Sequence, residues 1–242
     1  MRKLKVPFTL FLLLFLFLLS LSGHTKSTSS SYFKVPASIK NDTRFSGEKL
    51  YDSLGLENYG LSKKAWQYAI KGYQKLLTKG RIENTDVITI CDFSLSSRQK
   101  RLFIIDLKNG ELLLNTYVAH GRKSGMEYAR SFSNKANSHQ SSLGFYITRN
   151  QYYGENGLSL RLDGIDKGFN DKALKRNIVV HGSEYANDEF LNTNSFLGRS
   201  YGCPAVPEGD IENIVNTIKE GSCFFIYYPA KKYITSSKIL NG

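Results

Sequence analysis

The chain has 242 residues, with 33 Lys and Arg against 21 Asp and Glu, and a formal net charge of +12 at neutral pH. This length is sufficient for one compact domain, and the basic balance suits polyanionic surroundings such as a bacterial envelope. The basic residues are scattered and form no nucleic-acid-binding motif, so the composition argues against nucleic acid as a partner.

The first residues predict export. Three basic residues within positions 1–5 precede an apolar run over 6–21, which is the pattern of a secretory signal sequence. The small residues Ser20 and Ser22 favour cleavage after Ser22, and removal of residues 1–22 leaves a net charge of +9 (12 − 3). The alternative is an uncleaved membrane anchor, although the run is shorter than the ~20 residues of a spanning helix. The expected location is the periplasm or cell envelope, with membrane contact only through this segment if it is retained.

Two short regions follow before the main domain. Residues 23–41 are rich in Ser and Thr and predict a linker, because this composition cannot bury a core. Residues 42–81 predict a helical preface. Within it, 61–79 has apolar residues at three- and four-residue spacing with Ser62 as N-cap, and 52–59 predicts a shorter helix.

Residues 82–232 have the pattern of a β-rich domain. Apolar runs over 101–107 and 111–118 are joined through Asn109-Gly110, a strong hairpin signal. The other elements expected are strands over 86–93, 143–148, 159–162, 177–181 and 223–228, and a helix over 211–219. Strands without regular intervening helices favour a mainly β fold, a β-sandwich or barrel with a short helical N-terminal extension. Residues 233–242 are assigned as a C-terminal tail.

The chain has three cysteines, so at least one thiol stays unpaired in an oxidising compartment. Cys91 and Cys223 lie inside apolar strand patterns and are expected to be buried, and whether they form a disulfide is open. Cys203 instead lies between Gly202 and Pro204. Because glycine admits unusual backbone conformations and proline cannot donate a hydrogen bond, this thiol is expected to project from a fixed bend.

His181 ends an apolar run and is the candidate general base for Cys203. A thiol with a pKa near about 8.5 is mostly protonated at neutral pH, and a neighbouring imidazole can take its proton. The backbone N–H groups of Gly202 and Cys203 could hold an oxyanion, and a carbonyl near Gly182 could fix the imidazole tautomer. No third ligand occurs at zinc spacing, so neither a metal nor an organic cofactor is expected. From these residues alone, a Cys/His enzyme and a structural cysteine and histidine both stay open.

A His-Gly pair followed by Ser-x-Gly-Cys, here His181-Gly182 and Ser200-Tyr201-Gly202-Cys203, resembles the signature of the L,D-transpeptidase catalytic domain family. The chain resembles most specifically the envelope branch described as murein L,D-transpeptidase catalytic domain proteins. The other matching segments lie at 97–102, 118–121, 138–146, 152–154, 160–164 and 197–205. The chain departs from the family at Tyr201, where many members have His or Lys, and at Ala205, where many have Arg or Asn. These departures leave the pocket wall and the donor preference open.

The resemblance implies a reaction. Cys203 would attack the carbonyl of the third residue of a peptidoglycan stem tetrapeptide and expel D-alanine, with His181 as base. An amine from another stem peptide would then take the acyl group in cell wall remodelling. Water as acceptor would instead make the enzyme an L,D-carboxypeptidase, and a third alternative is a catalytically inactive wall-binding protein. A papain-type protease is excluded because its cysteine precedes its histidine in the chain.

Further polar residues near these motifs are candidates for supporting roles. Ser200 is a candidate for loop support together with Gly202 and Gly182, with ordinary turn chemistry as the alternative for Ser200. The candidates for substrate binding are Arg199, Tyr201, His139, Arg161, Tyr153 and His120. The arginines could pair with substrate carboxylates or with protein carboxylates, and the histidines could contact substrate or make structural hydrogen bonds. Tyr152 and Tyr153 point to opposite sides of their strand, so one of them is expected in the core.

Overall fold

The computed structural model of the chain describes residues 47–242. The signal peptide predicted over 1–22 and the linker predicted over 23–41 lie outside these residues, as does the start of the helical preface. Within 47–242, no helix is both long and apolar enough to cross a membrane.

Within residues 47–242, two helices, α2 (Gly47–Ser53) and α3 (Lys63–Thr78), precede the sheet. The predicted cap of α3 is confirmed, because the Ser62 hydroxyl accepts a hydrogen bond from the Ala65 N–H at 3.2 Å. The helix predicted over 52–59 is wrong in position: α2 ends at Ser53, and turns follow. Gly55 has a φ of 57°, a left-handed conformation that stops a helix.

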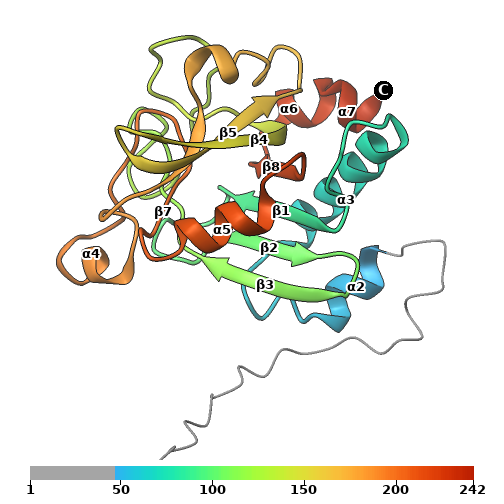
Figure 1. The fold of residues 1–242 in the computed structure, drawn as a ribbon, viewed down its shortest axis with the longest axis horizontal. Coiled ribbons are helices and arrows are strands. Elements are labelled where there is room, and N and C mark those ends of the chain that lie inside the picture. Colours follow the sequence, from blue (N-terminus) through green and yellow to red (C-terminus); the bar gives the residue numbers. More distant parts are fainter. Residues whose placement is uncertain (1–46) are drawn as a thin grey trace, which may run out of the picture. The chain divides into compact units, whose positions relative to one another are not determined.

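The strands form one mixed sheet in the order β3-β2-β1-β8-β4-β5-β6-β7 (Figure 1). Their bounds are β1 Val87–Asp92, β2 Leu102–Asp106, β3 Glu111–Thr116, β4 Gly144–Gly154, β5 Gly157–Gly164, β6 Val179–Gly182, β7 Ala205–Val206 and β8 Cys223–Tyr227. An antiparallel bridge joins Ala119, just after β3, to Ala205 on β7. The two edges of the sheet therefore meet, and the sheet nearly closes into a barrel, which confirms the predicted β fold. The hairpin predicted through Asn109-Gly110 is also confirmed.

The core extends from the sheet to α3. Phe145 on β4 stacks on Phe225 on β8 at a ring-centroid distance of 4.1 Å. A Cβ on Gly72 of α3 would lie 1.9 Å from the Phe145 ring, so only glycine lets the helix approach the sheet this closely. On the other side of the sheet, α5 (Ile211–Ile218) contacts β1, β5 and β6 through its buried apolar residues, and it lies where the helix over 211–219 was predicted.

The cysteines Cys91 and Cys223 are both fully buried, as expected, and all three thiols are free. In the parallel pairing of β1 with β8, Cys91 is opposite Ile226 and Cys223 is opposite Ile88. The two cysteines are thus three positions out of register, about 10 Å along the strands, and point to opposite faces of the sheet. A disulfide between them would require the sheet to rearrange.

The C-terminal residues 233–242 are not a tail. They belong to two short helices, α6 (Lys231–Ser236) and α7 (Lys238–Asn241), which bury Tyr233, Ile239 and Leu240. The buried Asp166 carboxylate accepts hydrogen bonds from the Tyr233 hydroxyl at 2.9 Å and from the Ser237 hydroxyl. Burial raises the pKa of Asp166. These contacts tie the C-terminus to the loop that follows β5. The short α4 (Asp188–Thr193), the two-residue β7 and the 3-10 turn η2 (Leu174–Arg176) were also not predicted.

Candidate active site

His181 lies on β6, which pairs in parallel with the short β7 so that His181 is opposite Ala205. The His181 N–H also donates to the Pro204 carbonyl at 3.4 Å. Cys203 lies two residues before Ala205, in the turn that leads into β7, so this turn lies next to β6. The backbone thus brings together the two residues on which the sequence prediction depends.

The surroundings of His181 select one tautomer of its ring. Nδ1 lies 2.9 Å from the Gly182 carbonyl oxygen, which can only accept, so Nδ1 carries the proton. Nε2 is then unprotonated, and within 47–242 it has no hydrogen-bond partner. Burial lowers the pKa of His181, although the bond to Gly182 opposes this effect, so the ring is neutral at neutral pH. The imidazole therefore presents an open lone pair.

The Cys203 side chain is half-buried, and its thiol donates to the Asn177 carbonyl at 3.7 Å. Burial raises the pKa of this thiol, while a backbone hydrogen bond at Val179 and the positive charge of Arg176 lower it. In the part of the chain that the structure describes, no hydrogen bond joins the thiol to His181. Transfer of its proton to the imidazole therefore requires the thiol to exchange the Asn177 carbonyl for Nε2, a tightening common when substrate enters such sites.

Ser200 closes the turn that carries Cys203. Its hydroxyl donates to the Cys203 carbonyl at 2.6 Å and accepts from the Gly202 N–H at 3.0 Å. Gly202 has a φ of 131°, and a Cβ there would lie 2.9 Å from the Gln140 carbonyl oxygen. One of the two expected oxyanion donors is thus corrected: the Gly202 N–H is already bound to Ser200. Among the described residues, the Cys203 N–H has no hydrogen-bond partner and stays available.

Arg176 was missed in the sequence. Its guanidinium donates to the Ser133 and Gln140 carbonyls at 2.8 and 2.7 Å and also contacts the hydroxyls of Ser138 and Ser142. It forms no ion pair with any described residue. Its charge therefore acts on the Cys203 thiol while its hydrogen bonds hold the loop that supports Gly202. No local signal marks this residue, because all these partners are more than 30 positions away.

Tyr201 and His139, two candidates for substrate binding, form a cluster next to the Cys203 turn. Their rings meet edge to face with centroids 4.8 Å apart, and Tyr201 is 66% exposed. The Arg122 guanidinium lies 4.5 Å from the Tyr201 ring centroid and donates from Nε to His139 Nδ1 at 3.2 Å. Desolvation and the charges of Arg122 and Lys123 lower the pKa of His139. The cluster presents a cation and two aromatic rings to solvent.

His120 is not available to substrate. Its side chain is 1% exposed, its Nδ1 accepts from the buried Arg101 guanidinium at 2.9 Å, and its Nε2 faces the Gly125 carbonyl at 3.4 Å. Burial, with the Arg101 charge, lowers the pKa of His120 to about 3. The ring is neutral and both nitrogens are occupied, so of the two roles that the sequence left open, His120 has the structural one and is not a substrate-binding residue.

The remaining candidates lie at different places. Arg199 donates to the Gly125 carbonyl at 3.3 Å and lines a hollow of about 460 Å³ together with Arg122.

Arg161 and the two tyrosines of β4 are placed by strand register. Arg161 on β5 is opposite Val179, and its guanidinium lies 4.3 Å from the Tyr152 ring centroid. Tyr152 is opposite Ser159, which is opposite His181, so Tyr152 and Arg161 share the His181 face of the sheet. Tyr153 points to the other face and is 81% exposed, so Tyr152 replaces it as the candidate. One of the two tyrosines was expected in the core, and this expectation is wrong. The end of the β4–β5 hairpin that carries both tyrosines projects away from the core.

The model of one protein family, the L,D-transpeptidase catalytic domain, matches residues 57–227, which is most of the chain. Among solved structures, an L,D-transpeptidase from Mycobacterium smegmatis is 10% identical over 59% of each chain, with a TM-score of 0.37. An L,D-transpeptidase from Xylanimonas cellulosilytica is 15% identical over 64% of this chain and 68% of its own, with a TM-score of 0.34. The helical cell shape determining protein from Campylobacter jejuni is 13% identical over 71% of this chain and 61% of its own, with a TM-score of 0.40. No curated protein sequence matches the chain.

Proposed function

We propose that this chain, which belongs to the L,D-transpeptidase catalytic domain family, is a cysteine-dependent acyltransferase acting on peptidoglycan stem peptides. One observation carries the proposal. The ring of His181 is fixed by its Nδ1–H bond to the Gly182 carbonyl, and its unprotonated Nε2 faces no other partner among the described residues, beside the turn of Cys203. A base that is oriented and neutral, next to a half-buried thiol, is the arrangement that nucleophilic catalysis by cysteine requires.

The first half of the reaction forms a thioester. The Sγ proton moves to His181 Nε2, and the thiolate attacks the carbonyl carbon of the third stem residue. The Cys203 N–H donates to the oxyanion that develops. The C–N bond to D-alanine then breaks, and the His181 imidazolium returns the proton to the departing amine.

The second half transfers the acyl group. An amine of another stem peptide attacks the thioester carbonyl and gives a proton to Nε2, and Cys203 leaves as thiolate. The thiolate then recovers the proton from the imidazolium. No electron transfer is needed, and the chain's own Cys203 and His181 carry both steps. Because stem peptides belong to the cell wall, the protein would act in the periplasm or cell envelope, which agrees with the export predicted from residues 1–22.

Two alternatives use the same scaffold. If water takes the place of the amine, the chain is an L,D-carboxypeptidase. If Cys203 does not react, the chain is a wall-binding protein. The Arg176 charge that acts on Cys203 is compatible with either acceptor, so the identity of the products must distinguish the two enzymes.

The test is mass analysis of a purified stem tetrapeptide after incubation with the full chain. A cross-linked dimer supports the transpeptidase, a tripeptide supports the carboxypeptidase, and unchanged tetrapeptide contradicts an enzyme. The Cys203→Ala variant should give no product, and Cys91→Ala, which removes a buried thiol of the core, serves as its matched control.

A further inference from the structure

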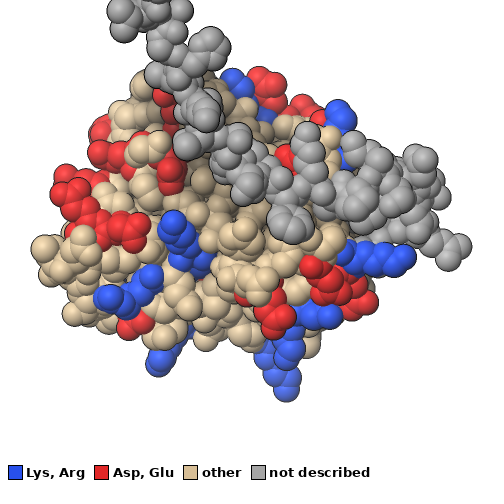
Figure 2. All heavy atoms as spheres, turned by 90° about the horizontal axis from the view of Figure 1, so that it is seen from below, with Lys and Arg blue, Asp and Glu red and all other residues tan. Residues whose placement is uncertain are grey.

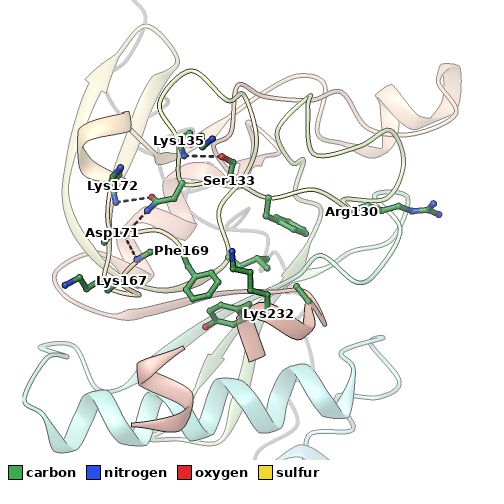
Figure 3. A pocket seen from close by; sticks show the side chains of 14 residues that line it. Arg130, Ser133, Lys135, Lys167, Phe169, Asp171, Lys172 and Lys232 are labelled. Carbon is green, nitrogen blue, oxygen red and sulfur yellow. Dashed lines mark hydrogen bonds between the residues drawn. The ribbon is translucent and has the colours of Figure 1, made fainter. Parts of the chain in front are cut away.

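A second hollow among the described residues is not lined by Cys203. It has a volume of about 600 Å³ and is built by the loop over 130–135, the loop over 167–172 and the start of α6 (Figure 3). Its volume is in the range of sites for small organic ligands. None of the residues discussed above as nucleophile, base or oxyanion donor lines it.

Positive charge dominates this pocket. Five cations line it against one carboxylate, Asp171, and the cations are Arg130, Lys135, Lys167, Lys172 and Lys232. None of the five makes an ion pair with a residue in 47–242, because the ion pairs found there lie elsewhere. In Figure 3 the Lys232 amine points toward the middle of the pocket, while Arg130 and Lys167 extend outward at opposite ends. On the face shown in Figure 2, by contrast, basic and acidic side chains are interspersed.

The pocket has a rigid frame. Phe169 packs edge to face on Tyr233 with ring centroids 5.1 Å apart, and the Tyr233 hydroxyl is held by the buried Asp166 at 2.9 Å. Asn134 joins the two loops, since its amide donates to Asp171 at 2.8 Å and its oxygen accepts from the Lys172 N–H at 3.1 Å. The two hydrogen-bonded loops and the aromatic wall therefore fix the backbone that carries the cations.

Arg176 links one wall of the pocket to the Cys203 turn. The Ser133 carbonyl at the pocket accepts from Arg176, which also donates to the Gln140 carbonyl. That carbonyl lies against Gly202, directly before Cys203. A polymer bound in the pocket would therefore contact the loop that carries Ser133 and Gln140 and that supports the Cys203 turn.

We propose that this pocket binds the carboxylates of a second, non-reacting stem-bearing sugar segment of the wall polymer whose stem reacts at Cys203. The proposal rests on the proposed function for the identity of that polymer. Four of the five cations are lysines spread around the opening, which suits separate single charges along a chain. Lysine binds phosphate as well as carboxylate, in both cases as a point charge, so the choice of ligand rests on the apolar surfaces between the lysines. The apolar surfaces of Phe132, Phe169 and Leu143 suit sugar faces and alanine methyl groups.

The probe is a purified disaccharide tetrapeptide, with binding measured by calorimetry to the full chain carrying Cys203→Ala, so that no turnover occurs. In this background, Lys167→Gln, Lys172→Gln and Lys232→Gln are combined. The matched control combines Lys63→Gln, Lys64→Gln and Lys79→Gln, which remove the same charge from exposed positions outside the pocket. We expect the pocket variant to bind about tenfold more weakly than the control, as the sum of three exposed ion pairs implies.

A second arm uses the same probe with its carboxylates amidated. This probe should bind weakly to both variants, and its binding should no longer distinguish them. Equal affinity of pocket and control variants for the native probe would overturn the proposal, as would binding that ignores amidation. A phosphodiester sugar polymer that binds with the same lysine dependence, when the disaccharide tetrapeptide does not, would overturn the assigned ligand. Failure of the proposed function looks different: the tetrapeptide is not turned over, yet lysine-dependent binding persists.

Discussion

The chain contains two His-Gly pairs at the ends of apolar runs, His120-Gly121 and His181-Gly182, and the two rings have different surroundings. His120 accepts from Arg101 at one ring nitrogen and faces the Gly125 carbonyl with the other. His181 uses only Nδ1, on its own neighbour's carbonyl. Both pKa values are lowered by burial, and that of His120 falls to about 3.

This difference shows what makes a histidine a candidate base. Burial alone keeps both rings neutral, so protonation state does not separate them. The difference lies in the unprotonated nitrogen of each ring. In His120 this atom is Nδ1, which accepts from the buried Arg101 guanidinium, and in His181 it is Nε2, which has no partner among the described residues.

The largest effect is expected at the thiol beside His181. A thiolate next to an oxyanion donor can be acylated by a strained lactam, and the family resemblance points to carbapenems. Intact-mass measurement should show a carbapenem adduct on the native chain and on Cys91→Ala, and none on Cys203→Ala. An adduct on Cys203→Ala, with the fold checked by circular dichroism, would move the nucleophile elsewhere.

A smaller loss of rate is expected at Ser200, which holds the Cys203 turn through two hydrogen bonds. Ser200→Ala leaves the Gly202 N–H and the Cys203 carbonyl without this partner, a loss of about 1–3 kcal/mol that corresponds to a roughly 5–150-fold slower acylation. Ser200→Thr retains the hydroxyl and serves as the control. Stopped-flow acylation rates that are equal for native chain and Ser200→Ala would show that the turn does not depend on this residue.

The next prediction concerns His120 and stability. Its pKa is about 3 in the folded chain and 6.5 when free, so the unfolded chain binds more protons between these values. Stability from this residue is therefore complete above pH 6.5 and is lost as the pH falls toward 3, by up to about 1.4 kcal/mol per pH unit. His120→Asn keeps an acceptor for Arg101 without a titrating ring. Denaturant unfolding at several pH values should show a shallower acid loss for this variant, with acylation at neutral pH nearly unchanged. If the acid loss is as steep as in the native chain, His120 is not its source.

The smallest effect is expected at Arg176, whose charge lowers the pKa of the Cys203 thiol. Arg176→Gln removes this charge, so the midpoint of acylation against pH should move to higher pH, by less than about one unit because the site is partly exposed. Arg176→Lys keeps the charge and should move the midpoint less. A midpoint that moves to lower pH in Arg176→Gln would contradict the assigned direction.

The parts that the sequence predicted correctly are those with local signals. The Ser62 cap, the spacing of apolar residues in α3 and the Asn109-Gly110 turn each act within a few positions. The end of the chain lacked such a signal, because α6 and α7 are too short for a clear period and depend on their contacts with Asp166.

Within the site, the sequence showed the Gly-Cys-Pro turn as a motif. It did not show the long-range contacts that give His120 and Arg176 their roles. Arg101 on His120 and Arg176 on Ser133 join residues 19 and 43 positions apart. Likewise, only the strand register shows that Tyr152, and not Tyr153, shares the face of His181. Such long-range pairings arise when the sheet assembles, so single-sequence patterns do not contain them.

The central claim is that His181 is the base for Cys203, and its most direct test is the acylation rate against pH for the native chain and His181→Ala. In the native chain the rate should fall on the acidic side with an apparent pKa that belongs to the coupled pair. Because general-base assistance contributes about 10²–10⁴-fold, His181→Ala should react slowly at neutral pH. It should then recover in part as rising pH ionises the thiol. Superimposable profiles for two folded proteins would contradict the account and make His181, like His120, a structural histidine.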